Sequence, residues 1–215
     1  ISEKGLPTYD YDPEKSRELL AGAGFTYDDS GQLFDKDGNR VSFSLITNAG
    51  NQVREALGAQ IKQDLSEIGI EVNFTPIDFN NLVGKLTDSL DWECHLLGFT
   101  GGIEPHGGST IWSVDGRLHS FNQDRADPPI VGREVSDWEQ EIADLYVAGS
   151  KEFDEAKRYE IYSKTQIVTQ EQLPYIYLVN PLSMSAIRDN IENVKYSALG
   201  GAFWNLHEQI GRAHV

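Results

Sequence analysis

The sequence has one cysteine, few basic residues and no long hydrophobic run. Cys94 has no second cysteine with which it could form a disulfide inside the chain. It lies in the apolar segment DWECHLLGF, so we expect a small buried side chain. A lone cysteine does not exclude an extracytoplasmic location, because it only withholds the support that a disulfide would give.

Basic residues are scarce beside acidic ones: 18 Lys and Arg stand against 34 Asp and Glu, and the formal net charge is -16. This charge repels phosphates, which argues against nucleic acid as a partner. No stretch approaches the roughly 20 apolar residues that a membrane-spanning helix needs. With 39% hydrophobic and 24% charged residues, the 215-residue chain has the composition of an ordinary globular protein. Its length suits one large domain or two small ones.

Sequence signatures of common enzymes are also missing. The chain has no G-x-S-x-G elbow and no H-E-x-x-H zinc helix, and TGGIEPHGG lacks the Gly-Lys-Ser/Thr end of a phosphate loop. His95, His106 and His119 are spread over a predicted strand and loops, with no spacing that makes them converge on a metal. We therefore predict no catalytic residue, no metal site and no cofactor.

The amino-terminal part predicts a helix followed by a hairpin. Asp12 is suited to cap the helix, Pro13 to its first position and Gly24 to its end. Leu19 and Leu20 are expected to face a core. Residues 31–48 then predict a hairpin with DKDGN as its turn.

Three predicted strands follow, separated by helices. The strands are expected at about Val41–Thr47, Ile70–Pro76 and Trp92–Phe99, with helices over about 49–68 and 78–90. One apolar stripe on the first of these helices is formed by Val53, Leu57, Ile61, Leu65 and Ile68. The order strand–helix–strand–helix–strand predicts an α/β fold with a parallel or mixed sheet covered by helices.

The second half is predicted to be richer in loops and helices. Residues 101–135 are loop-rich, which is long for a structureless connection and typical of functional or disordered segments. Helices are expected after the caps Ser136 and Asp154. The apolar segments LPYIYLVNP and LSMSAI predict two further strands.

Two predicted loops leave the carboxyl ends of strands, where open α/β sheets bind ligands. Glycines let a backbone approach a ligand closely, and asparagine offers both donors and acceptors. Glu104 offers a charge for an ammonium group or a sugar hydroxyl, and Trp112 offers a flat apolar wall. The candidate ligand-binding residues are Asn48, Asn51, Thr100, Gly101, Gly102, Glu104, His106 and Trp112.

Each candidate also has a purely structural interpretation. Asn48 and Asn51 could only cap the following helix, and Glu104 could be a solvated loop carboxylate. His106 could satisfy local backbone groups, and the glycines could simply build turns. The residues alone leave these alternatives open.

Four ordered segments resemble one protein family. They are YDPEKSRELLAGAGF, LITNAGNQVREALGAQIKQDLSEIGIEVNFTPIDFNNLVGKL, DWECHLLGFTGGIEPHGG and QEQLPYIYLVNPLSMSAIRDNIENV. Together they are similar to extracellular solute-binding proteins of family 5, the dipeptide- and oligopeptide-binding components of ABC importers. The resemblance covers nearly all of Leu6 to Glu208.

The resemblance implies a two-lobed binding protein of the type II periplasmic-binding-protein class, closing around its ligand at a hinge. This chain would be most of the second lobe, with a mixed sheet flanked by helices. The implied partners are a peptide or other small solute and an ABC permease, and the protein is expected to be a monomer. A periplasmic or extracellular location follows, with lipid anchoring left open. In peptide-binding members a loop carboxylate pairs with the peptide's ammonium group, and Glu104 is the nearest candidate here.

The resemblance also divides the chain. Residues 1–180 are expected to form the second lobe and residues 181–209 a return segment toward a first lobe. The last six residues, IGRAHV, could be encoded by ATC GGA AGA GCA CAC GTC, which resembles a common sequencing-adapter sequence. We therefore expect 210–215 to be a non-native tail and exclude Arg212 and His214 from the site. A ligand-sensing module and, less favoured, a hydrolase are the alternative functions.

Overall fold

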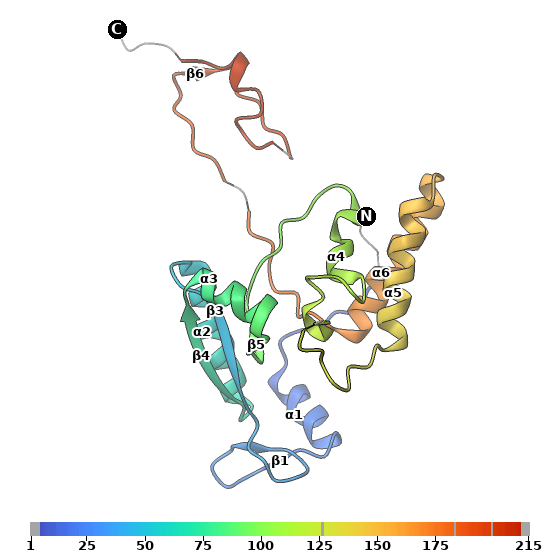
Figure 1. Ribbon diagram of the computed structural model, residues 1–215. Helices are drawn as coiled ribbons and strands as arrows, with labels where there is room; N and C mark the ends of the chain where they lie inside the picture. Colours follow the sequence, from blue (N-terminus) through green and yellow to red (C-terminus); the bar gives the residue numbers. More distant parts are fainter. Residues whose placement is uncertain (1–4, 126, 183, 199, 212–215) are drawn as a thin grey trace. The chain divides into compact units, whose positions relative to one another are not determined.

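The computed structural model describes residues 5–125, 127–182, 184–198 and 200–211 (Figure 1). The chain forms two compact units, Ile1–Tyr175 and Ile176–Val215. The predicted boundaries after residues 180 and 209 remain predictions. No described helix combines the length and the apolarity that crossing a membrane would require.

A three-stranded parallel sheet organises the first unit. Its middle strand is β3 (Ser42–Asn48), with β4 (Glu71–Ile77) on one side and β5 (Cys94–His95) on the other. The helix α2 (Gln52–Glu67) connects β3 to β4, as the alternating pattern predicts. The segment that leads from β4 to β5 contains α3 (Phe79–Gly84) and a π-helical turn over Lys85–Ser89. The predicted α/β fold is confirmed, but the sheet implied by the resemblance was mixed, whereas all three described strands are parallel.

The third strand is shorter than the predicted Trp92–Phe99. The Leu96 amide still donates to the Ile46 carbonyl at 2.9 Å. The Leu96 carbonyl, however, accepts from the Thr47 side-chain hydroxyl at 2.7 Å. The Thr47 hydroxyl therefore occupies the Leu96 carbonyl oxygen, which would otherwise accept the next backbone hydrogen bond from β3. Regular strand pairing ends at this point.

Apolar side chains of α2 and the sheet form the core of this layer. Leu45, Val72 and Leu96 are buried at its centre, and the packed side chains around them are Phe43, Leu57, Ile61, Leu65, Ile70, Phe74 and Cys94. Val53 departs from the predicted stripe because its side chain is 65% exposed. It lies in the first turn of α2, which begins beyond the carboxyl end of β3, so no strand covers it.

Polar contacts attach the first helix, α1 (Pro13–Gly22), to the rest of the unit. Asp12 caps it as predicted, accepting from the Lys15 amide at 2.9 Å. The expectation that Leu19 faces a core is wrong, since Leu19 is 63% exposed. Instead, Arg17 donates to the Glu67 carbonyl at the end of α2 and lies over the Tyr27 ring.

The predicted DKDGN turn is present between β2 (Leu33–Phe34) and β3, but only the single bridge between Phe34 and Arg40 joins its two sides, because β3 pairs with β4 and β5 instead. The Asp35 amide donates to the Asn39 carbonyl at 2.9 Å, and Gly38 has a φ of 81° that favours glycine. Before the turn, β2 pairs with β1 (Thr26–Tyr27) in an antiparallel ribbon. After it, the chain enters β3.

Two long helices and several short ones form the rest of the first unit. The helix α5 (Asp137–Lys151) begins with a capping box between Ser136 and Glu139, and α6 (Glu155–Gln172) begins at its cap Asp154. Both caps were predicted. The loop-rich region contains η2 (Pro105–Gly108), α4 (Ser109–Trp112) and η3 (Ser120–Asn122).

In its described residues the second unit contains a small antiparallel pair, β6 (Ile191–Glu192) with β7 (Ile210–Gly211), and a turn of helix, η4 (Leu206–Glu208). The strands predicted from LPYIYLVNP and LSMSAI are wrong for the described residues 173–182 and 184–187. Apolar content alone cannot make a strand that lacks a hydrogen-bonded neighbour. Residues 212–215, which include Arg212 and His214, lie outside the described residues.

Candidate ligand-binding site

The carboxyl ends of all three parallel strands lie at one edge of the sheet. Asn48 at the end of β3 is in register with Ile77 at the end of β4, and Ile46 is in register with His95 at the end of β5. The segments that leave Asn48 and His95 therefore start from the same edge, as predicted. Figure 1 shows the second of these segments as the green coil between β5 and α4.

Asn48, the first candidate residue, binds Arg54, which the sequence pattern did not single out. Arg54, in the first turn of α2, donates from Nη1 to Asn48 Oδ1 at 2.6 Å. Asn48 therefore does not cap α2 through this oxygen. An added Cβ at Gly98 would lie 3.2 Å from Arg54 Nη2, so the missing side chain lets the guanidinium lie against the segment after β5.

Asn51 has a structural role that the sequence left open. It is the N-cap of α2, and its side chain accepts from the Arg54 amide at 3.0 Å. This bond satisfies one of the amides that the first helical turn leaves without an intrahelical partner.

The middle of the second loop is exposed. Thr100, Gly101 and Gly102 are solvent-exposed, and added Cβ atoms at the two glycines would meet nothing within 4 Å. The neighbouring side chains of Phe99 and Ile103 are 51% and 75% exposed. This stretch offers both backbone groups and apolar surface to a ligand.

Glu104 already has a cationic partner inside the protein. Its carboxylate forms an ion pair with the guanidinium of Arg158 on α6. It also caps η2 by accepting from the His106 amide at 3.4 Å. The hydrogen bond from Arg158 is the largest cause that lowers the pKa of Glu104, which is therefore a carboxylate at neutral pH.

His106 and Trp112 lie in the helical turns after the loop. His106 Nδ1 is buried and has no hydrogen-bond partner within the described part of the chain. Trp112 stacks on Tyr146 with ring centroids 6.3 Å apart and meets the edge of Tyr175 at 5.7 Å. Trp112 is thus packed among aromatic side chains, which cover part of the indole surface that was expected to be free to contact a ligand.

Arg54 and Arg158 differ in whether the sequence could have revealed them. Arg54 lies three residues after the cap Asn51, in the first turn of the helix that follows the β3 loop. Its position beside that loop could therefore be inferred from the local sequence. Arg158 is 54 residues from Glu104, and no sequence spacing predicts their contact.

The described residues contain no group of three His, Cys, Asp or Glu side chains that could hold a metal ion. What the edge of the sheet offers is a guanidinium, amide groups and exposed loop backbone. Such groups can orient a ligand by hydrogen bonds, and they contain no nucleophile paired with a base.

Comparisons with known proteins cover the same region. The family model of bacterial extracellular solute-binding proteins, family 5 Middle, matches residues 2–117, more than half of the chain. A probable ABC transporter-binding protein of Deinococcus radiodurans is 31% identical, over 87% of this chain and 33% of its own length. The oligopeptide-binding protein AppA of Bacillus subtilis is 26% identical, over 89% of this chain and 33% of its own length.

Solved structures share the fold. The structure of Bacillus subtilis AppA in complex with a nonapeptide has a TM-score of 0.76 at 23% identity and covers 99% of this chain and 40% of that chain. NikZ from Campylobacter jejuni in complex with Ni(L-His) has a TM-score of 0.70 at 18% identity, over 98% and 41%. The chain spans about one third of the length of the curated relatives it matches. On the strength of the family match, this chain belongs to the bacterial extracellular solute-binding proteins of family 5.

Proposed function

We propose that the chain is the second lobe of the substrate-binding component of an ABC importer. In this proposal the whole protein captures a peptide or similar small solute between two lobes and delivers it to a membrane permease. It acts as a monomer in the periplasm or outside the cell. The observation that carries the proposal is the family match over residues 2–117, which contains the parallel sheet and both loops at its carboxyl edge.

The proposed ligand contacts come from the two segments that leave β3 and β5 at that edge. They are Asn48, Asn51, Thr100, Gly101, Gly102, Glu104, His106 and Trp112. A closing cleft removes water from such groups, so that a few aimed hydrogen bonds become stronger than they are in water. The exposed backbone of Thr100–Gly102 supports a direct contact, because nothing in this loop covers it.

Peptides are the first ligand class to test, because AppA is an oligopeptide-binding protein and its structure contains a nonapeptide. NikZ binds Ni(L-His) on a similar fold, so the fold alone does not select a solute. The ligand must therefore be identified by experiment.

The test is to express the full-length gene product and identify co-purifying ligand by mass spectrometry. Transport is then measured as uptake of that ligand with and without the neighbouring permease gene. We expect a small solute in the purified protein and uptake that depends on both genes. A protein that binds solute but leaves uptake unchanged when deleted would favour a sensing role instead.

The proposal also predicts that this chain alone binds weakly. One lobe leaves its ligand in contact with water, where polar contacts are largely screened. Titration of the full-length protein and of the 215-residue chain with the same ligand compares them. Equal affinity would contradict the two-lobed mechanism.

A further inference from the structure

Resting on the proposed function, we propose that Glu104 and Arg158 form an anchor that positions the ligand loop, and that the ligand presents no cationic group to Glu104. Arg158 then acts as a positioning residue. The ligand group received by this loop is uncharged and is bound through exposed backbone and apolar side chains.

Three contacts fix the guanidinium of Arg158. Nη2 pairs with the Glu104 carboxylate, and Nε donates to the Gly149 carbonyl at 3.1 Å. The guanidinium also lies over the Tyr162 ring, 5.7 Å from its centroid. Tyr162 is itself fixed, because its ring packs against Gly149 so closely that an added Cβ there would lie 2.6 Å away. The cation is therefore preorganised by the packed helices α5 and α6.

A preorganised guanidinium is a stronger competitor for Glu104 than a ligand ammonium. Arg158 loses little freedom when it pairs with the carboxylate, because its other contacts already hold it. A mobile ammonium would have to displace it or share the carboxylate. The negative charge of Glu104, which was expected to pair with a ligand ammonium, is thus paired with Arg158 of the protein itself.

The anchor explains how a glycine-rich loop keeps its position. The loop begins where Thr47 binds the Leu96 carbonyl at 2.7 Å, and it ends where Glu104 binds α6. Between these fixed ends, Phe99–Ile103 remains exposed. A loop held at both ends can present backbone groups in one geometry, which lowers the entropy cost of binding.

The test uses full-length protein and two pentapeptide libraries that differ only in a free or an acetylated amino terminus. The variants are Glu104→Arg, Arg158→Glu and the double reversal. An anchor predicts that each single reversal weakens binding of both libraries, by about two- to fivefold for a pair of this exposure. The double variant should bind more tightly than either single variant, because the opposite charges are restored in exchanged positions.

Glu104→Gln separates the two roles of the carboxylate. An anchor predicts an equal loss for the free and the acetylated library. A loss confined to the free library, together with no rescue by the double reversal, would show that Glu104 binds a ligand ammonium and would overturn the inference.

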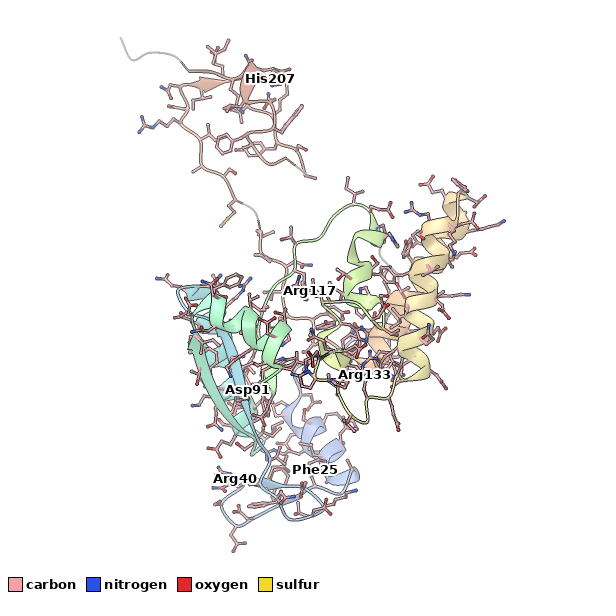
Figure 2. The ribbon with its side chains drawn as sticks, in the orientation of Figure 1. Phe25, Arg40, Asp91, Arg117, Arg133 and His207 are labelled. Atoms are coloured by element: carbon pink, nitrogen blue, oxygen red, sulfur yellow. The ribbon has the colours of Figure 1, made fainter. Side chains whose placement is uncertain are left out.

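The ion pair between Arg40 and Glu71 provides a matched control. Its partners are 2.8 Å apart and 43% and 39% exposed, and it lies where β3 and β4 begin, as Figure 2 shows for Arg40. Arg40→Glu should leave peptide binding unchanged. If wild-type protein retains neither library, the proposed peptide function fails, and this inference fails with it. If it retains both but the reversals have no effect, only the anchor is refuted.

Discussion

The imidazole of His119 lies 3.1 Å from the carboxylate of Glu139, and the two side chains are only 1% and 3% exposed. His119 Nδ1 is 2.9 Å from the Ile111 carbonyl oxygen. Glu139 also accepts from the Asn122 side chain at 2.7 Å and from the Ser136 amide at 3.2 Å. This buried polar network ties the loop-rich region after α4 to the first turn of α5.

Removing the imidazole should destabilise the protein strongly. His119→Ala removes one of the three hydrogen-bond partners of the buried Glu139 carboxylate, and losing a partner of a buried polar group typically costs about 1–3 kcal/mol. We expect a loss of this size in the free energy of unfolding, measured by urea denaturation at neutral pH. His207→Ala is the control, because His207 is 75% exposed and should change stability little. Equal effects of the two variants would show that the network contributes nothing.

The same network predicts a dependence of stability on acid. Burial raises the pKa of Glu139. Hydrogen bonds from Asn122, His119 and Ser136 together lower it by more, so the pKa of Glu139 in the folded protein lies below its ordinary value. A lowered pKa stabilises the folded state above the unfolded-state value of about 4.3, and this contribution is lost as the pH falls through the lower folded-state value.

Denaturation of wild type and Glu139→Gln from about pH 7 to about pH 3 isolates this contribution. The difference in unfolding free energy between them should be largest near neutral pH and shrink in acid. A difference that stays constant over this range would contradict the assignment of an ionised, hydrogen-bonded Glu139.

Two helical glycines should respond differently to the same substitution. An added Cβ at Gly58 in α2 would lie 2.3 Å from the Phe74 ring, whereas one at Gly22 in α1 would meet nothing within 4 Å. Gly58→Ala should destabilise the protein by about 1–3 kcal/mol, because the helix must move away from the sheet. Gly22→Ala should be neutral or stabilise by up to about 1 kcal/mol. Thermal denaturation of both variants checks the contrast.

Local patterns predicted the elements whose signals are themselves local. Asp12, Ser136 and Asp154 cap helices as expected, because a cap needs only its own first turn. The alternation of strands and helices also predicted a parallel or mixed sheet, and the described strands form a parallel one. The apolar segment around Ile176 and Leu178 failed as a strand, because strand formation depends on a neighbour that sequence alone does not supply.

The candidate site shows the same limit. Position in the fold predicted that Asn48 and the glycine-rich loop start from one edge of the sheet. The partner of Glu104 could not be predicted, because Arg158 reaches it only through the packing of α5 and α6. A carboxylate in a loop therefore says little about its role until its neighbours are known.

Asn51 permits a separation of helix capping from ligand contact. Its side chain accepts from the Arg54 amide, and aspartate can accept the same bond while it adds a negative charge at the edge of the sheet. Asn51→Ala should lower the unfolding free energy by about 1 kcal/mol, and Asn51→Asp should retain the stability of wild type.

If the Asn51 amide also donates to the ligand, Asn51→Asp should weaken binding of the co-purified ligand despite normal stability, because a carboxylate cannot donate. Calorimetric titration combined with thermal denaturation measures both quantities. Unchanged affinity in Asn51→Asp would leave Asn51 with the cap as its role and remove it from the ligand contacts.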